Sequence, residues 1–129
     1  MIKSIYLTYI TVVLLLGTTA SFVEAPTFTK TIYGHGVASW YGAWHHGREM
    51  ANGSMFDMYK FTVAHKTLPL GTLLRIRNLV NGREVVARVT DRGPYIEGRE
   101  LDLSYAVAKK LGFVENGITK VMFRKEKPI

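Results

Sequence analysis

The acidic residue best placed for chemistry is Asp91, which closes an alternating segment and comes just before a bend. The apolar residues that share its parity are Val85, Ala87 and Val89. Because successive side chains of a strand point to opposite faces, Asp91 is expected on the apolar side as the strand ends. The sequence RGP that follows predicts a tight bend, which can leave this carboxyl group facing a groove. Such a group acts either as a general acid or base, or as a structural cap of the turn.

The histidines do not have the spacing of a metal site. His45 and His46 are adjacent, so their side chains point in different directions and chelate one ion poorly. A Zn²⁺ site needs three or four convergent ligands, and no further ligand cluster lies near them in the sequence. We therefore expect neither a metal nor another cofactor.

The elements that must position Asp91 are short strands. Candidates are Gly36–Tyr41, Phe61–Ala64, Thr72–Asn78, Arg83–Thr90 and Thr119–Arg124. Asn81-Gly82 lies between the third and the fourth, and this dipeptide strongly favours a β-hairpin turn.

One helix is predicted over Tyr105–Leu111, with Ser104 as its N-cap. Lys109 and Lys110 fall in its last turn, where cations interact favourably with the helix dipole, and Gly112 ends it. Asp102 is interpreted as structural, binding backbone at the helix start. Several short strands with one short helix indicate a small, mostly-β barrel.

The N-terminal segment has the order of a secretory signal peptide: Lys3, an apolar run over residues 5–16, then small residues. We expect residues 1–25 to be this signal, with cleavage after residue 25 or after residue 20, and an uncleaved anchor as the alternative. Residues 26–33 are interpreted as a linker, 34–124 as one domain and 125–129 as a frayed tail. The protein is expected to be exported, to the periplasm or cell envelope.

Charge and cysteine content limit the partners. The chain has 129 residues, no cysteine, and 17 Lys and Arg against 10 Asp and Glu, a formal net charge of +7. Without cysteine, neither a lipid anchor at the signal nor disulfides are expected. A basic surface attracts polyanions. For an exported protein we expect the bacterial wall, whose glycan carries carboxylates, and not nucleic acid; general solubility is the alternative explanation.

Six sequence blocks carry a resemblance to a known family. They read GVASWYG (36–42), HGR with ANG (46–53), AHKTLPLGT (64–72), NLVNGR (78–83), DRGP (91–94) and GRELDLS (98–104). In this order they resemble the RlpA (rare lipoprotein A) family of lytic transglycosylases, over residues 34–124. The resemblance implies a six-stranded double-psi β-barrel with one or two short helices.

The resemblance also implies an activity. It is endolytic, non-hydrolytic cleavage between N-acetylmuramic acid and N-acetylglucosamine of peptidoglycan, with a preference for glycan strands without stem peptides. The product carries a 1,6-anhydro end. One carboxylic acid suffices, because it protonates the leaving oxygen and then takes the proton of the sugar's own 6-hydroxyl. By analogy with the family, the protein is expected to act in cell-wall organisation at the septal ring, as a monomer, with division-site cell-wall enzymes as possible partners.

The resemblance assigns functional roles to individual residues. Asp91 matches the family's catalytic aspartate, and His65 matches its second important polar position. Trp40 and Tyr41 either form an aromatic platform for a sugar ring or fill the barrel core. The remaining predicted substrate-binding residues are Asn52, Ser54, Lys66 and Arg92, the last two of which are alternatively solvated surface charges.

One position departs from the family pattern. Family members typically read ANGE where this chain reads ANGS, so Ser54 replaces a glutamate thought to assist catalysis. Serine forms hydrogen bonds but is not an acid near neutral pH. Asp57, three residues later, is another carboxyl group nearby. The second hypothesis is therefore a catalytically weakened, expansin-like barrel that binds wall glycan without cutting it.

Overall fold

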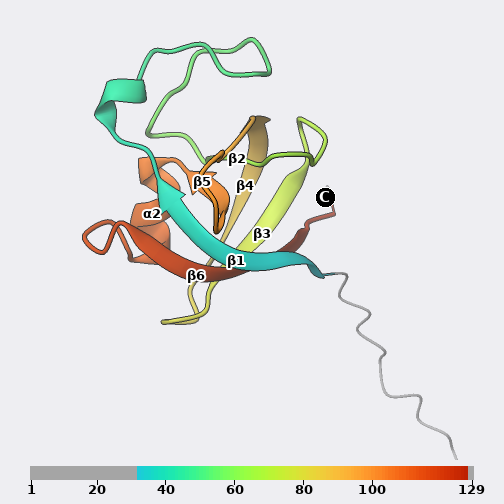
Figure 1. The fold of residues 1–129 in the computed structure, drawn as a ribbon, viewed down its shortest axis with the longest axis vertical. Helices are drawn as coiled ribbons and strands as arrows, with labels where there is room; N and C mark the ends of the chain where they lie inside the picture. The colour runs from blue at the N-terminus through green and yellow to red at the C-terminus, as the bar shows by residue number, and fades with distance from the viewer. Residues whose placement is uncertain (1–31, 128–129) are drawn as a thin grey trace, which may run out of the picture.

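The computed structural model describes residues 32–127. Their strands close into a barrel with one α-helix outside it (Figure 1). The elements are β1 (Ile32–Trp40), the 3₁₀ helix η1 (Ala43–His45), β2 (Thr62–Ala64), β3 (Leu73–Asn78), β4 (Glu84–Asp91), β5 (Arg99–Leu103), α2 (Tyr105–Leu111) and β6 (Ile118–Lys125).

The strand order around the barrel is β1-β5-β2-β4-β3-β6. The pairs β1/β5 and β2/β4 are parallel, and the other neighbours are antiparallel. Strands paired in parallel need crossover connections, and both parallel pairs here join strands that are not consecutive in the sequence. The predicted architecture, a mostly-β six-stranded double-psi barrel with one or two short helices, is confirmed.

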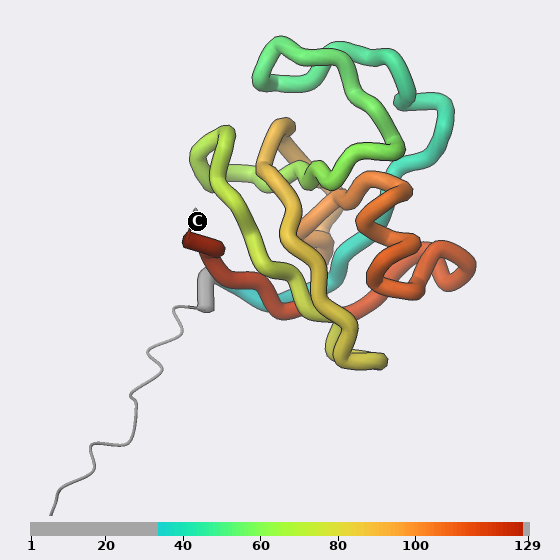
Figure 2. The backbone as a smooth tube through the Cα atoms, turned by 180° about the vertical axis from the view of Figure 1, so that it is seen from behind, coloured from blue at the N-terminus to red at the C-terminus, as the bar shows by residue number. Residues whose placement is uncertain are grey.

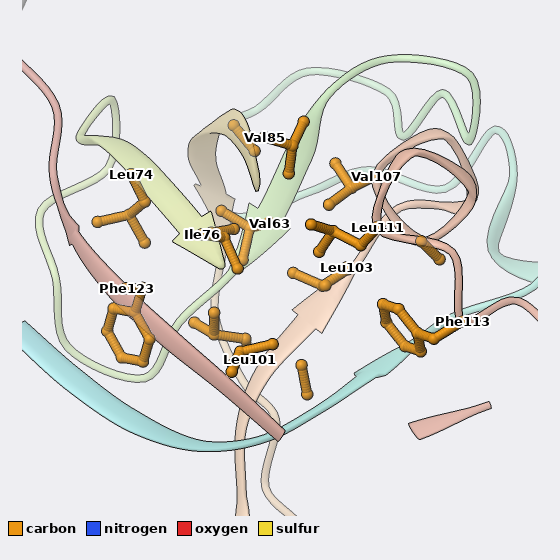
Figure 3. Packing of buried hydrophobic residues seen from close by; sticks show 14 of the residues in the cluster. Val63, Leu74, Ile76, Val85, Leu101, Leu103, Val107, Leu111, Phe113 and Phe123 are labelled. Atoms are coloured by element: carbon orange, nitrogen blue, oxygen red, sulfur yellow. The ribbon is translucent and has the colours of Figure 1, made fainter. Parts of the chain in front are cut away.

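The core lies inside the barrel and beneath α2 (Figure 3). In β4, Val85, Ala87 and Val89 are buried as their alternation predicted. The alternation ends at Thr90, which is also buried, beside an irregularity in the register of β2 with β4. The largest buried apolar side chains include Phe113, Phe123, Leu74, Ile76, Leu101, Leu103 and Leu111.

The helix forms as predicted. The Ser104 hydroxyl accepts a hydrogen bond from the Val107 N–H and donates one to the Lys60 carbonyl, 2.6 Å away. Gly112 ends α2 in the left-handed conformation, with φ of 75°. The carbonyl of Leu111 accepts from the side-chain amides of Asn78 and Asn81, at 2.9 and 2.8 Å. The NLVNGR segment thus forms the predicted turn between β3 and β4 and also holds the C-terminal end of the helix.

Strand β5 was not among the strands predicted from local patterns. Asp102 lies within it, and its carboxylate accepts a hydrogen bond from the Ser39 hydroxyl of β1 instead of binding backbone at the helix start. The alternation Leu101-Asp102-Leu103 is a strand signal that could have identified this element.

The described domain extends beyond the predicted limits of 34 and 124. Strand β1 begins at Ile32, inside the predicted linker, and β6 runs to Lys125. Glu126 accepts two hydrogen bonds from the Arg75 guanidinium, at 2.8 and 3.1 Å, so the first two residues of the predicted tail belong to the barrel. The predicted signal peptide lies outside the described residues. Within residues 32–127, no helix is long and apolar enough to cross a membrane.

A long excursion between β1 and β2 passes over one end of the barrel, above the end of β4 (Figures 1 and 2). It contains η1 and a short bridge between Glu49 and Met55. This excursion covers the end of the barrel at which Asp91 lies.

Candidate active site

Asp91 is the last residue of β4 and is half-buried. Its Oδ1 accepts hydrogen bonds from the backbone N–H groups of Ala51, at 3.0 Å, and Arg92, at 2.8 Å. Among residues 32–127, Oδ2 has no hydrogen-bond partner. One carboxylate oxygen is therefore fixed, and the other is free for a proton or a ligand. The bond from Arg92 is also the turn-capping contact that was the structural alternative for this residue.

The loop of the excursion is attached to the same end of β4. The Asn52 N–H donates to the Thr90 carbonyl at 3.1 Å, and the Thr90 hydroxyl contacts the sulfur of the buried Met50 at 3.3 Å. Together with the Ala51–Asp91 bond, these contacts place the ANGS segment beside the carboxylate.

Asn52 and Ser54 are both exposed in this loop. The Asn52 Oδ1 accepts from the Ser54 N–H at 3.0 Å and from the Ser54 hydroxyl at 2.7 Å. These two bonds shape the turn and occupy the Asn52 carbonyl oxygen, whereas its amide N–H₂ donates to no described residue. Ser54 thus contributes a turn contact at the position where the resemblance implied a glutamate.

His65 follows β2 and also lies next to Asp91. Its backbone N–H donates to the Asp91 carbonyl at 3.2 Å. The Nδ1 atom accepts from the N–H groups of Thr67 and Leu68, at 3.1 and 3.0 Å, so the neutral ring carries its proton on Nε2.

Burial lowers the pKa of His65, and the positive charges of Arg92 and Lys66 lower it further, while Glu100 opposes them. The acceptor role of Nδ1 acts in the same direction as burial, because protonating it would remove two hydrogen bonds. His65 is therefore a neutral ring near neutral pH, with an Nε2–H donor available.

The two cations predicted to bind substrate hold backbone at this end of the barrel. The Arg92 guanidinium donates to the carbonyls of Leu68, at 2.7 Å, and His65, at 3.3 Å. The Lys66 ammonium donates to the Arg99 carbonyl at 2.8 Å. Both groups have further N–H donors, so they contribute positive charge beside Asp91 as well as fixing the loops around it.

Trp40 and Tyr41 lie in different surroundings. Trp40 packs against the core, its Nε1–H donates to the Val114 carbonyl at 3.1 Å, and its ring meets Tyr105 edge-on at 5.6 Å. These contacts favour the core alternative for Trp40.

The Tyr41 ring lies 4.5 Å from the Phe56 ring and 5.2 Å from the His45 ring, measured between centroids. Its hydroxyl is buried and has no hydrogen-bond partner among the described residues. Burial, followed by the negative charges of Asp91 and Asp102, raises the pKa of Tyr41 above its usual range. Tyr41 therefore belongs to the surroundings of Asp91, with Asp102 as a second carboxylate that the sequence reasoning had not placed there.

The described residues contain no group of three His, Asp or Glu side chains that could hold a metal ion. His46 Nδ1 accepts from the Met58 N–H at 3.2 Å, and the ring of its neighbour His45 lies against Trp44. The Nδ1 atom of His46 is therefore occupied, whereas that of His45 is buried and has no hydrogen-bond partner among the described residues.

Comparison with known proteins identifies the family of this chain. A model of the lytic transglycolase family matches residues 33–123. The chain belongs to this family. The predicted resemblance to RlpA proteins is confirmed, because the relatives include a probable endolytic peptidoglycan transglycosylase RlpA of Aquifex aeolicus that is 55% identical over 86 residues. The RlpA of Pseudomonas aeruginosa is 54% identical over 86 residues, and that of Neisseria meningitidis is 47% identical over 98.

These relatives are longer proteins. The matches span 67% of this chain but only 38% of the Aquifex protein and 25% of the Pseudomonas protein; for the Neisseria protein the shares are 76% and 39%. The similarity thus concerns the barrel domain of each relative.

Solved structures share the fold at low sequence identity. A Clavibacter michiganensis expansin in complex with cellohexaose is 21% identical, with a TM-score of 0.59, over 74% of this chain and 51% of its own. The Streptomyces papain inhibitor is 23% identical, with a TM-score of 0.58, over 74% of this chain and 97% of its own. Both likenesses support the barrel fold.

Proposed function

We propose that this chain is an endolytic peptidoglycan lytic transglycosylase that cleaves between N-acetylmuramic acid and N-acetylglucosamine without hydrolysis. The observation that carries the proposal is the carboxylate of Asp91, with Oδ1 held by two backbone N–H groups and Oδ2 without a partner among the described residues. The names of the RlpA relatives support the same activity.

In this reaction Asp91 first acts as an acid. Protonated at Oδ2, it gives its proton to the glycosidic oxygen as the bond from C1 of N-acetylmuramic acid breaks. The resulting carboxylate then takes the proton of the 6-hydroxyl while O6 bonds to C1. The products are a 1,6-anhydro end and a new free hydroxyl on the leaving sugar, and Asp91 is protonated again. No water enters, so a single carboxyl group serves both steps.

The other groups have supporting roles in this proposal. The Nε2–H of His65 donates to a sugar oxygen near the cleaved bond, and the free amide N–H₂ of Asn52 donates to the strand from the loop. Lys66 and Arg92 attract the lactyl carboxylates of muramic acid, which are exposed when stem peptides are absent. Glycan strands without stem peptides are therefore the proposed substrate, and the cell envelope the proposed place of action, with the protein working as a monomer at division sites.

The test is digestion of denuded glycan strands with the purified protein, followed by mass spectrometry of 1,6-anhydro ends. Asp91→Asn is the informative variant, because the amide oxygen can still accept from Ala51 and Arg92 while no acidic proton is available. Loss of general acid–base catalysis reduces rates by about 10²–10⁴-fold. A variant that releases anhydro ends at the wild-type rate would exclude Asp91 from the chemistry.

The second candidate function is glycan binding with weak or no cleavage. It is favoured by Ser54, whose hydroxyl is bonded to Asn52 in place of a second carboxylate. Ser54→Glu, run beside the wild type, separates the two functions. Anhydro ends from Ser54→Glu alone would indicate a barrel that still binds glycan and has lost part of its chemistry. Wild-type activity at the level of Ser54→Glu would show that the glutamate is dispensable here.

A further inference from the structure

The hydroxyl of Tyr41 is a buried polar group that the proposed reaction does not use. It is enclosed by the protein, yet it has no hydrogen-bond partner among residues 32–127. A buried hydroxyl without a partner is destabilising, so its presence calls for an acceptor within reach. The ring cannot turn away freely, because Phe56 and His45 pack against it.

The polar groups around this hydroxyl come from three elements. Asp91 ends β4 and Asp102 lies in β5, and both are paired with Ala64 of β2 in the strand register. The Tyr41 N–H donates to the carbonyl of Leu103, the residue after Asp102, at 3.1 Å, and the His45 ring of η1 lies against the Tyr41 ring. Asp102 already accepts from the Ser39 hydroxyl through Oδ1, and Asp91 already accepts two N–H groups through Oδ1. Among residues 32–127, the Oδ2 atoms of both carboxylates and the buried Nδ1 atom of His45 have no hydrogen-bond partner. Of these acceptors, Oδ2 of Asp91 is the one on the group that performs the proposed chemistry.

We propose that Tyr41 is a positioning residue for Asp91, whose hydroxyl donates a hydrogen bond to Oδ2 of the ionised carboxylate formed between the two proton transfers. This inference rests on the proposed function for its role in turnover. One lone pair of Oδ2 accepts from Tyr41, and the other takes the proton from the 6-hydroxyl. The bond would hold the carboxylate plane fixed while its charge appears and disappears.

The phenol of Tyr41 keeps its proton throughout the proposed reaction. Burial and the two carboxylates raise the pKa of Tyr41, so the phenol remains a hydrogen-bond donor well above neutral pH. A donor to the charged form stabilises that form relative to the protonated one. Removing the hydroxyl should therefore make Asp91 easier to protonate, which weakens it as an acid and slows the first step, the donation of its proton to the glycosidic oxygen.

The variant Tyr41→Phe removes the hydroxyl and keeps the ring contacts with Phe56 and His45. In a ¹³C NMR titration of side-chain carboxyls, the midpoint for Asp91 should move to higher pH, corresponding to about tenfold tighter proton binding. The alkaline limb of kcat/KM on denuded glycan should move in the same direction, and kcat should fall. Tyr105→Phe removes the hydroxyl of a tyrosine outside the site and should change neither profile.

The titration decides the inference without requiring activity, so failure of the proposed function would be seen separately. An Asp91 midpoint equal in wild type and Tyr41→Phe, or a shift confined to Asp102, would overturn it. A second measurement needs no change at Tyr41. In the wild type, the ¹³Cζ resonance of Tyr41 should follow the Asp91 titration, and this dependence should vanish in Asp91→Asn. Its persistence there would assign the hydroxyl to Asp102 instead.

Discussion

The side chain of Asn78 is the clearest place to test how this barrel is held together. It is 1% exposed at the end of β3 and makes three hydrogen bonds. Its amide nitrogen donates to the Leu111 carbonyl at 2.9 Å, and its oxygen accepts from the Val80 N–H at 3.0 Å and the Thr119 hydroxyl at 2.8 Å. One side chain therefore connects β3, β6, the β3–β4 turn and the end of α2.

Asn78→Ala should lower the free energy of unfolding by about 3 kcal/mol, at about 1 kcal/mol for each of the three bonds. Water cannot replace the bond from Thr119, because Thr119 is itself buried and its hydroxyl is left without a partner. For a domain of this size, such a change lowers Tm by on the order of 15 °C. Equilibrium unfolding in urea, with an unchanged m-value, measures it directly.

Asn81→Ala is the matched control. Asn81 also donates to the Leu111 carbonyl, at 2.8 Å, but it is exposed, and its other bond is to the Arg83 N–H in the turn. Water can replace these partners, so the expected cost is about 1 kcal/mol or less. The double variant removes both donors from Leu111 and should cost more than the sum of the two. If Asn78→Ala cost no more than Asn81→Ala, the reasoning from burial would be refuted.

Two further predictions concern pH and backbone conformation. Because burial lowers the pKa of His65, the unfolded chain binds that proton more readily, so stability should fall as pH decreases from 6.5 toward the lower pKa of the folded state. Urea unfolding should show a steeper decrease there for the wild type than for His65→Gln, and equal slopes would contradict the assignment. Gly112→Ala and Gly117→Ala both place alanine at positive φ, 75° and 76°, which costs about 1–2 kcal/mol. Only at Gly112 would the new Cβ also meet side chains. The Arg83 guanidinium, with Nη1 at 2.6 Å, can move aside, but Asn81 Nδ2 at 3.1 Å is held by its hydrogen bond to the Leu111 carbonyl. Thermal unfolding should therefore find Gly112→Ala less stable than Gly117→Ala, and equal Tm values would argue against this contact.

Local patterns in the sequence were sufficient to predict the elements that depend on neighbouring residues. The cap at Ser104, the lysines of the last turn and Gly112 predicted α2 with its observed bounds, because capping and left-handed glycine depend on adjacent residues. The Asn-Gly turn between β3 and β4 was predicted for the same reason. Strand β5 was missed because three of its five residues are charged, its alternation covers only Leu101–Leu103, and it directly precedes the helix cap.

The roles of the charged residues depended on contacts that no local pattern contains. Lys66 and Arg92, which were predicted to bind substrate, also each donate at least one hydrogen bond to a carbonyl more than 20 residues away. Asp102 was expected at the helix start and lies against Ser39, 63 residues away.

The sequence by itself determined that the chain is a small β-barrel of the lytic transglycolase family with Asp91 as its candidate acid. These conclusions rest on alternation, turn residues and the order of six blocks, which are all features of the linear sequence. Only the tertiary structure decided which groups surround the carboxyl group of Asp91. The Ala51 N–H that fixes Oδ1 is 40 residues from Asp91, and the buried hydroxyl of Tyr41 is farther still. Parallel pairing in a closed barrel brings these groups together, and the surroundings of a carboxyl group are set by what is near in space.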